Sequence, residues 1–330
     1  MIKIETYKMK YFKKLFPLTL LIFFGVVHAQ QYPIKPIKMY VAGAAGDGID
    51  VVSRRIAQKL SEKLGQPFII ENRPGAGGGI NASEATAKAT PDGYTLMMGN
   101  AGTLTINPGL LPRLTYDPVK DFAPITLAAI VPNLLVANSG FPVNSVADLI
   151  TLSKKQPGRI NFASPGTGTG QHLGGELFKS MANIDLVHVP YKGSGPGVTD
   201  LLAGQVELMI VPLPVVLAHV TSGKLKALGI TSLKRSSLLP AIPTVSEAGL
   251  NGYDVSAWYG IVAPAGTPVQ ITELLNLEIV KILNTTETRE YLQKFGAETG
   301  GNSKEEFSLF MRNETQKWKN VIKISGIKTE

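Results

Sequence analysis

Residues 37–64 read IKMYVAGAAGDGIDVVSRRIAQKLSEKL. The first five residues have the apolar character of a buried strand, and the small residues at 43–48 that follow predict a loop. From about residue 50 to residue 64, Val51, Ile56, Leu60 and Leu64 recur at the spacing of one helix face. Strand, small-residue loop and helix together form the unit from which parallel α/β sheets are built.

The same unit recurs along most of the chain, in two groups. We predict further strands at residues 67–71, 94–98, 133–136, 160–163, 186–189, 206–210, 225–231 and 258–263. We predict further helices at residues 81–89, 145–155, 171–181, 198–203, 214–222, 268–283, 286–295 and 304–322. The grouping predicts two α/β lobes, the first made of residues 30–128 plus 254–330 and the second of residues 129–253. The chain would cross between them near residues 123–130 and return near residues 232–257.

The N-terminal segment has the features of a cleavable secretory signal peptide. Five lysines precede an apolar run at residues 15–27, and Val27 and Ala29 place small residues where a signal peptidase reads. We therefore predict that residues 1–29 are a signal peptide, cleaved after Ala29, and that the mature protein is periplasmic. A transmembrane anchor is the alternative, but the run is shorter than the roughly 20 apolar residues that a membrane-spanning helix needs.

Charge and cysteine content exclude several classes of function. The formal net charge is +8, and removing residues 1–29, with five lysines and Glu5, would leave +4. No basic cluster with interleaved aromatic residues indicates a nucleic-acid partner. The chain has no cysteine, which excludes disulfides, thiol catalysis and cysteine metal sites. His172, His188 and His219 lack the spacing of a zinc helix, so we predict neither a metal nor a cofactor.

Four loops share one design, in which small residues follow a strand and lead into a helix. They lie at residues 44–50, 99–103, 164–169 and 191–197. The first N–H groups of a helix lack internal partners and carry partial positive charge, and small residues let a ligand approach them closely. Ligands of open parallel sheets bind at the carboxyl ends of the strands. We therefore expect loops of both lobes to clamp a carboxylate in one cleft.

Other interpretations of these loops are weaker. Glycine-rich loops also join strands to helices where no ligand binds, but four of them in two lobes favour a cleft. The run GGGINA at residues 77–82 fits a loose dinucleotide pattern but does not follow a strand directly, and residues 166–170 lack the end of a P-loop. Ser194 is not in a nucleophile elbow. His172 is better explained as a polar lining or cap residue than as a general base.

Ordered sequence blocks over nearly the whole chain resemble the solute-binding receptors of tripartite tricarboxylate transporters, the Bug family. The blocks are YPIKPI at 32–37, LGQP at 64–67, ENRPGAGG at 71–78, PDGYTL at 91–96, YDPVKDFAP at 116–124, VHVPYKG at 187–193, IPTVSEAG at 242–249 and APAGTP at 263–268. The resemblance implies a type II periplasmic-binding-protein fold, in which two α/β lobes enclose a ligand cleft and are joined by two crossover segments. It also implies capture of a small organic carboxylate and delivery to the membrane permease subunits of such a transporter. We expect a monomer.

The resemblance also implies which residues contact the ligand. In the first lobe these are Ala44, Ala45, Gly46, Asp47, Gly48, Asp50, Asn100 and Thr103. In the second lobe they are Ser164, Gly166, Thr167, Gly168, Thr169, His172, Tyr191, Lys192, Gly193, Ser194, Val211 and Pro212. Backbone N–H groups, hydroxyls and bridging waters would provide most of the contacts.

Three residues depart from the family pattern in ways that bear on the ligand. The first loop usually reads PPGGGTD in the family and is AAGDGID at residues 44–50 here. Asp47 brings a negative charge, Ile49 removes a hydroxyl, and Val211 stands where an aspartate is common. Either these changes are neutral and Asp47 points to solvent, or the ligand has one carboxylate plus a cationic group near Asp47 or an apolar body near Val211.

Two further functions remain as alternatives to a transport receptor. A sensor that reports its ligand to a membrane signalling protein would use the same binding chemistry, so the sequence does not separate it from a transport receptor. An extracytoplasmic enzyme acting on a carboxylate would need a nucleophile or an acid–base pair in the cleft. No motif of that kind is present, so we expect a protein that is not an enzyme.

Overall fold

The computed structural model describes residues 32–327, so the predicted signal peptide lies outside the described residues. Strand β1 (Ile37–Val41) pairs in parallel with β2 (Phe68–Asn72) and with β3 (Thr95–Asn100). Helix α1 (Gly48–Leu64) connects β1 to β2, and helix α2 (Ala76–Ala87) connects β2 to β3. The carboxyl ends of β1 and β3 therefore lie at the same edge of the sheet. We call this group of elements the first lobe.

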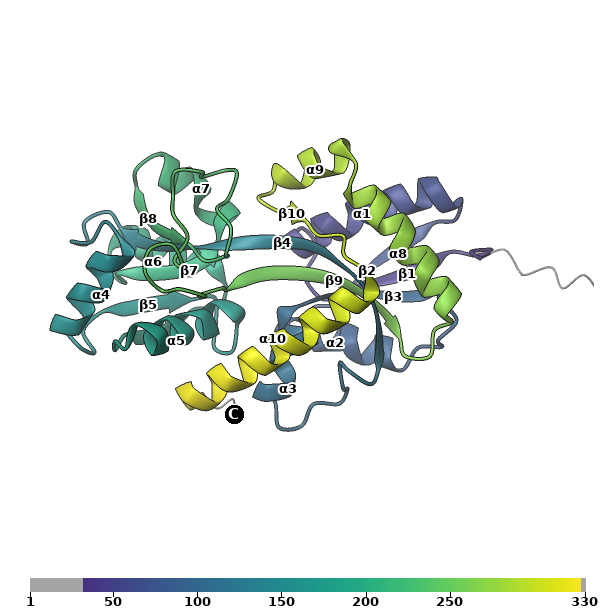
Figure 1. Cartoon of the computed structure of the whole chain (residues 1–330), viewed down its shortest axis with the longest axis horizontal. Helices are drawn as coiled ribbons and strands as arrows, with labels where there is room; N and C mark the ends of the chain where they lie inside the picture. Colours follow the sequence, from purple (N-terminus) through teal and green to yellow (C-terminus); the bar gives the residue numbers. More distant parts are fainter. Residues whose placement is uncertain (1–31, 328–330) are drawn as a thin grey trace, which may run out of the picture. The chain divides into compact units, whose positions relative to one another are not determined.

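Two long strands join the first lobe to the rest of the sheet (Figure 1). Strand β9 (Ser256–Pro264) is antiparallel to β3 and to the first part of β4 (Phe122–Asn138). The two-residue strand β10 (Glu298–Thr299) also pairs with β4. From residue 133 onward, β4 changes partners and pairs with strands of the second group. One continuous strand thus belongs to both halves of the molecule.

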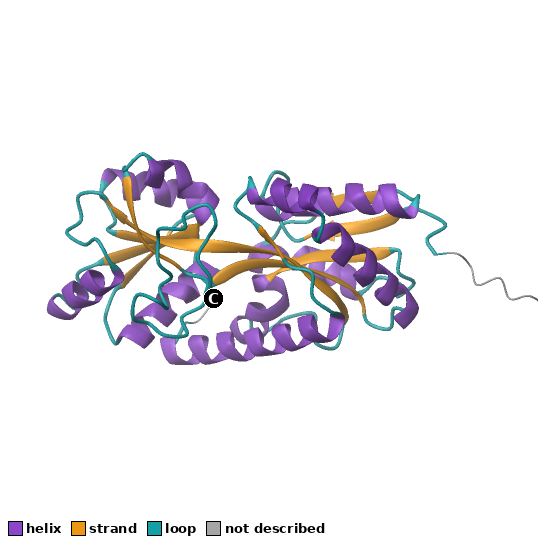
Figure 2. Cartoon of the chain, turned by 45° about the horizontal axis from the view of Figure 1, so that its top comes forward, coloured by secondary structure: helices purple, strands orange, loops and turns teal. Residues whose placement is uncertain are grey.

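The second group of strands forms a second lobe. Its strands are β5 (Asn161–Ser164), β6 (Val187–Pro190), β7 (Leu208–Pro212) and β8 (Leu225–Ile230). Strand β5 is parallel to both β6 and β7, whereas β7 and β8 are antiparallel to β4. Its helices are α4 (Val146–Lys155), α5 (Gly170–Ala182), α6 (Ser194–Ala203) and α7 (Leu213–Thr221). Helices lie on both sides of the strands, as a parallel sheet with two buried faces requires (Figure 2).

The remaining helices complete the two faces of the sheet. They are the short π-helix η1 (Gly102–Ile106), α3 (Asn107–Leu110), α8 (Val269–Leu283), α9 (Thr286–Gln293) and α10 (Lys304–Ser325). Helix α10 begins with a capping box, in which Ser303 and Glu306 exchange side-chain and backbone hydrogen bonds. Helix α10 packs against η1, α3 and α5, and therefore touches elements of both lobes.

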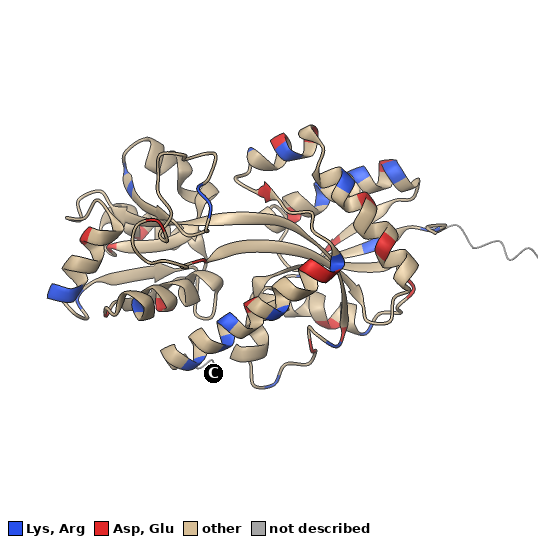
Figure 3. Ribbon diagram, viewed as in Figure 1, with Lys and Arg blue, Asp and Glu red and all other residues tan. Residues whose placement is uncertain are grey.

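Charged residues lie outside the two bridging strands. Neither β4 nor β9 contains a lysine, arginine, aspartate or glutamate, and both strands are uniformly tan in Figure 3. Most of their residues are buried, which fits strands that are covered by helices on both faces. Among the described residues, no helix is both long enough and apolar enough to span a membrane.

The two-lobed α/β organisation agrees with the sequence prediction, but several elements differ. The prediction placed a strand only at residues 133–136 and a crossing segment at residues 123–130, whereas β4 is one strand through both. It also missed η1, α3 and β10. The lobe boundaries at 128/129 and 253/254 stay a prediction, since β4 itself runs continuously through the first of them.

Candidate functional site

Loops at the carboxyl ends of β1, β3, β5, β6 and β7 surround two adjoining cavities. The α5 cavity, of about 480 Å³, is bounded by Asn100–Gly102 of the first lobe and by Thr167–Gln171 at the start of α5. The α1 cavity, of about 690 Å³, is bounded by the loop before α1 and by the first turn of α7. Four residues line both cavities, namely Gly78, Asn100, Pro212 and Tyr259.

In the loop before α1, the buried carboxylate of Asp50 holds the backbone in place. Asp50 is 3% exposed and accepts hydrogen bonds from the N–H of Gly46, Nε of Arg54 and Nδ2 of Asn72, each at 2.9 Å. Burial alone would raise its pKa, but these hydrogen bonds outweigh burial and lower the pKa below its ordinary value. Asp50 lines neither cavity, so its side chain supports the loop and does not contact a ligand there.

Asp47 lies on the other side of this loop. Its side chain is exposed, lines the α1 cavity, and accepts the N–H of Ala44 through Oδ2 at 3.0 Å. Asp47 is therefore exposed to solvent and part of the cavity wall at the same time, so both expectations for this residue stay predictions. Ala44, Gly46 and Gly48 also line this cavity, whereas Ala45 lines neither.

Asn100, at the end of β3, holds three loops together. Its Nδ2 donates to the carbonyl oxygens of Ala42 at 2.9 Å and Gly78 at 2.7 Å, and its Oδ1 accepts the N–H of Thr103 at 3.1 Å. Gly78 lies in a run of three glycines with positive φ, and a Cβ there would come within 2.9 Å of Asn100. Thr103 is fully buried and lines neither cavity, so of the two predicted contacts here only Asn100 reaches the cavities.

The loop before α5 presents backbone and hydroxyl groups to the α5 cavity. Thr167, Gly168 and Thr169 line it, followed by Gly170 and Gln171 in the first turn of the helix. Thr169 is the N-cap residue, and its hydroxyl accepts the N–H of His172 at 3.2 Å. The N–H groups of Gly170 and Gln171 precede the first intrahelical hydrogen bond, so they are free to bind a ligand.

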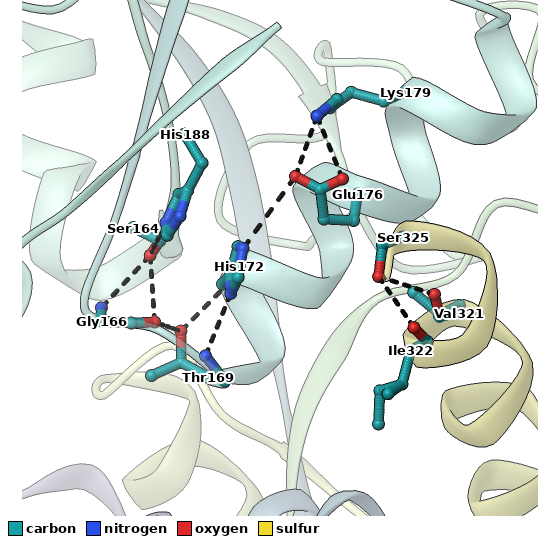
Figure 4. A network of polar contacts seen from close by, with 11 residues as sticks. Ser164, Gly166, Thr169, His172, Glu176, Lys179, His188, Val321, Ile322 and Ser325 are labelled. Atoms are coloured by element: carbon teal, nitrogen blue, oxygen red, sulfur yellow. Dashed lines mark hydrogen bonds and ion pairs between the residues drawn. The ribbon is translucent and has the colours of Figure 1, made fainter. Parts of the chain in front are cut away.

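Two stacked histidines support this loop from inside the second lobe (Figure 4). The rings of His172 and His188 are 3.7 Å apart between centroids and nearly parallel. His172 Nδ1 accepts the N–H of Gly168 at 3.0 Å, and His188 Nε2 lies 2.7 Å from the hydroxyl of Ser164. Ser164 is fully buried and His172 is 4% exposed. Ser164, Gly166 and His172 line neither cavity, so these predicted contacts are the scaffold of the loop.

Both histidines are neutral at physiological pH. Burial, the neighbouring His188 ring and Lys179 lower the pKa of His172 to about 3. Burial and Lys179 lower the pKa of His188 to about 4. Because Nδ1 of His172 accepts a hydrogen bond, its proton resides on Nε2, which faces a carboxylate oxygen of Glu176 at 4.0 Å.

Only some of the remaining predicted contacts of the second lobe line a cavity. Ser194 lines the α1 cavity and Pro212 lines both cavities, whereas Tyr191, Lys192 and Gly193 line neither. Tyr191 donates its hydroxyl to Asp200 at 2.8 Å; burial and Asp200 raise its pKa to about 12.

Val211 is fully buried in the hydrophobic core of the second lobe, among residues such as Leu134, Ala163 and Met209. Its side chain lines neither cavity. The expectation that it shapes a place for an apolar ligand body is therefore not met, because its side chain packs within this core and not in a cavity wall.

Several lining residues were missed by the sequence prediction. In the α5 cavity these include Gln171, Asn133, Trp258 and Trp318, and in the α1 cavity they include Val215, Lys294 and Phe295. Tyr259 lines both; burial and the charge of Asp47 raise its pKa to about 12, so its hydroxyl remains a donor. Trp258 and Tyr259 could have been found from their position, because both lie on the bridging strand β9, next to the carboxyl ends of the strands that carry the loops.

The α5 cavity suits an anion held by neutral donors. No lysine, arginine, histidine, aspartate or glutamate lines it, and the start of α5 supplies N–H groups at the positive end of the helix dipole. Gln171, which donates through Nε2 to Asn133 at 3.0 Å, adds amide groups to the wall. Within residues 32–327, no cluster of three histidine, aspartate or glutamate side chains is placed to hold a metal ion.

Comparisons with known proteins agree with this arrangement. A model described as the tripartite tricarboxylate transporter family receptor matches residues 52–327. The chain is 38% identical to protein BugT of Bordetella pertussis, over 92% of this chain and 93% of BugT. It is similar to the structure of R. palustris Rpa4515 with adipate, with a TM-score of 0.78 and 36% identity over 90% of this chain and 99% of that one. It is also similar to MatC from Rhodopseudomonas palustris with bound malate, with a TM-score of 0.74 and 33% identity over 88% and 100% of the two chains. These similarities confirm the predicted two-lobed fold.

Proposed function

Because the chain belongs to the family of tripartite tricarboxylate transporter receptors, we propose that it captures a small organic carboxylate between its lobes and delivers it to a membrane permease. The observation that carries this proposal is the α5 cavity, whose uncharged donors come from loops of both lobes. The adipate and malate in the two related structures are carboxylates that such donors suit. The family is one of solute-binding receptors and not of enzymes.

We propose that the ligand's carboxylate is held by the first turn of α5. Its oxygens would accept the N–H groups of Gly170 and Gln171 and the hydroxyl of Thr167 or Thr169, while Asn100 and Gly102 close the site from the first lobe. Buried hydrogen bonds to a charged group each contribute about 1.5–3 kcal/mol. A few such bonds account for binding without an arginine or lysine.

Capture between lobes implies a closing motion. A ligand that contacts both lobes favours the closed arrangement by its greater affinity for it. We propose lobes of residues 30–128 plus 254–330 and of residues 129–253, with the hinge where β4 exchanges partners, at Pro132 and Asn133. On β9, the corresponding point is Ser256, the first residue of the strand and the partner of Pro132, where the chain returns from the second lobe.

The proposed function also implies a cellular location and protein partners. The family consists of periplasmic proteins, and we propose that export depends on residues 1–29 with cleavage after Ala29. The mature receptor would then diffuse as a monomer and meet its permease subunits by collision. A sensor that feeds a membrane signalling protein remains the second candidate, and purification of the receptor with its membrane partner distinguishes the two.

A thermal-shift screen tests the proposed function directly. The mature protein is heated with mono-, di- and tricarboxylates, amino acids and aromatic acids, and with the matching amides as controls. A ligand at 100 times its dissociation constant stabilises the folded state by about 2.7 kcal/mol, which raises the melting temperature by roughly 4 °C or more. Failure of every carboxylate to raise the melting temperature above its amide control would refute carboxylate capture.

The proposed contact at α5 predicts the effect of one substitution. Gly170→Pro removes the N–H at the first helical position, where proline is tolerated, and Thr169 already has the extended conformation that a following proline requires. We expect affinity for the tightest-binding carboxylate to fall about 10- to 100-fold, since one hydrogen bond to a charged group is lost. Isothermal titration calorimetry measures this change.

Gly170→Ala is the matched control, because it keeps the N–H. A Cβ at this position would have Ile106 as its nearest neighbour at 3.8 Å, an ordinary contact, so the alanine fits. If the proline and alanine variants bind the carboxylate equally well, the first turn of α5 does not hold it.

A further inference from the structure

The α1 cavity gives a ligand held at α5 room for its other end. The two cavities adjoin at Gly78, Asn100, Pro212 and Tyr259, so a molecule of a few carbon atoms extends from one into the other. Much of the α1 cavity wall is apolar, including Ile49, Val51, Val131, Val215 and Phe295. The charged groups that line this cavity therefore determine which terminal group of a ligand binds favourably there.

Two N–H groups of the loop before α1 are already occupied by carboxylates of the protein. The N–H of Ala44 is occupied by Oδ2 of Asp47 at 3.0 Å, and the N–H of Gly46 by Oδ2 of Asp50 at 2.9 Å. These two N–H groups are therefore not available to a ligand anion, and an anion at the first N–H groups of α1, those of Gly48 and Ile49, would lie beside the negative charge of Asp47. The start of α5 differs, because no aspartate or glutamate lines the cavity beside its first N–H groups.

The two aspartates differ in how their charge is compensated. Asp50 forms an ion pair with Arg54 at 2.9 Å. Asp47 forms no ion pair with any residue from 32 to 327, and it lines the α1 cavity with its second oxygen uncommitted. Its charge helps to raise the pKa of the Tyr259 hydroxyl, and Tyr259 lines both cavities. The α1 cavity is thus negative at the loop before α1.

We propose that Asp47 determines specificity, by selecting carboxylates that carry an ammonium or hydroxyl group at the other end and rejecting those that carry a second carboxylate. The inference rests on the proposed function, and on the carboxylate end of the ligand lying at α5. The donor at the far end hydrogen-bonds the free oxygen of Asp47. A second carboxylate meets the negative charge of Asp47.

Lys294 is the other charged side chain that lines the α1 cavity, and it has the opposite effect on a second carboxylate. Its ammonium stands on an exposed, flexible stem at the end of α9, where water solvates it. Asp47 is held in one orientation by the N–H of Ala44. The fixed charge therefore discriminates more strongly than the mobile one.

The experiment compares matched ligands on matched variants by isothermal titration calorimetry. The ligands are straight-chain acids of four and of six carbons that end in a methyl, hydroxyl, ammonium or carboxylate group. The variants of the mature protein are Asp47→Asn, Lys294→Gln and Asp92→Asn. The asparagine at position 47 keeps an oxygen for the N–H of Ala44 and removes only the charge. Asp92 pairs with Lys35 on the surface and lines neither cavity, so its variant controls for net charge.

We expect the wild-type protein to bind the amino or hydroxy acid about tenfold more tightly than the diacid of equal length. Asp47→Asn should abolish this preference, a change of about 1.4 kcal/mol, whereas Asp92→Asn should retain it. The inference is overturned if the wild-type protein prefers diacids. It is also overturned if the preference survives in Asp47→Asn or changes only in Lys294→Gln. Each of these outcomes leaves the receptor function intact. If no carboxylate of any class binds, the proposed function itself fails, and the inference with it.

Discussion

Substituting Trp318 by alanine is expected to lower the free energy of unfolding by about 3–5 kcal/mol, the usual cost of deleting a buried tryptophan side chain. Trp318 lies in α10, is 1% exposed, and donates through Nε1 to Glu314 at 3.0 Å. It belongs to a hydrophobic cluster that joins Ile106 and Leu110 of the first lobe to Phe178 of the second. The substitution leaves a cavity at the point where the two lobes share a core.

Urea unfolding followed by circular dichroism measures this loss without relying on tryptophan fluorescence. Trp318→Phe should cost less, because the phenyl ring fills much of the cavity. Leu309→Ala on the same helix is the surface control; Leu309 is 52% exposed, so its substitution should change stability by less than about 0.5 kcal/mol. A Trp318→Ala protein within 1 kcal/mol of the wild type would show that the end of α10 does not stabilise the junction.

Helices and strands were predictable where their own residues determine their secondary structure. Strand β1 was predicted at residues 37–41, which are the residues it occupies. Helix α4 was predicted at residues 145–155, and the hydroxyl of Ser145, its N-cap residue, accepts the N–H of Asp148 at 3.0 Å. Apolar periodicity and capping act within a few residues, so they are legible in the sequence alone.

Elements that depend on distant partners were not predictable in this way. The first part of β4 was missed because Pro124 and Pro132 interrupt an otherwise apolar run, and proline usually argues against a central strand. In the structure the register of β4 against β9 shifts between Pro124 and Thr126, so the strand accommodates the proline at an irregularity. The two-residue β10 exists only because β4 is there to pair with it.

The loops of the site were predictable, but the face that each loop presents was not. Loops have no periodicity, so the sequence does not say which residues point into a cavity. Three predicted contacts point away from the cavities because each has a hydrogen-bond partner there: Asn72 for Asp50, His188 for Ser164 and Gly168 for His172. The first two partners lie on other elements, and the third lies in the same loop. Small residues and hydroxyls identified loops that do line the two cavities, and hydrogen bonds decided which of their residues lie behind the cavity walls.

The stacked histidines predict a loss of stability in acid. His172 and His188 have pKa values of about 3 and about 4 in the folded protein, below the ordinary histidine value, because burial disfavours their charged forms. Between the ordinary value near pH 6.5 and these values, the unfolded chain binds protons that the folded chain does not. The stability that the folded protein gains from keeping these histidines neutral is therefore fully present above about pH 6.5. It is lost as the pH falls towards 4. We expect this pair to account for a loss of about 3 kcal/mol or more by pH 4.

Isosteric variants separate this effect from the protonation of carboxylates. His172→Asn keeps an acceptor near the position of Nδ1 for the N–H of Gly168, and His188→Gln keeps a polar group near Nε2 for the hydroxyl of Ser164. The double variant should show a clearly smaller decrease in unfolding free energy between pH 7 and pH 4 than the wild type, measured by urea titration at each pH. The charged neighbours Glu176 and Lys179 are present in both proteins, so the difference reports on the histidines alone.

The same protonation should reach the ligand, because Gly168 lines the α5 cavity. A proton on Nδ1 of His172 would face the N–H of Gly168, where no acceptor would remain to hold the loop. Carboxylate affinity of the wild type should therefore fall relative to that of the double variant as the pH approaches 4, and comparison at equal pH cancels protonation of the ligand itself. Parallel pH profiles for the two proteins, in stability and in affinity, would mean that the histidines do not hold the loop.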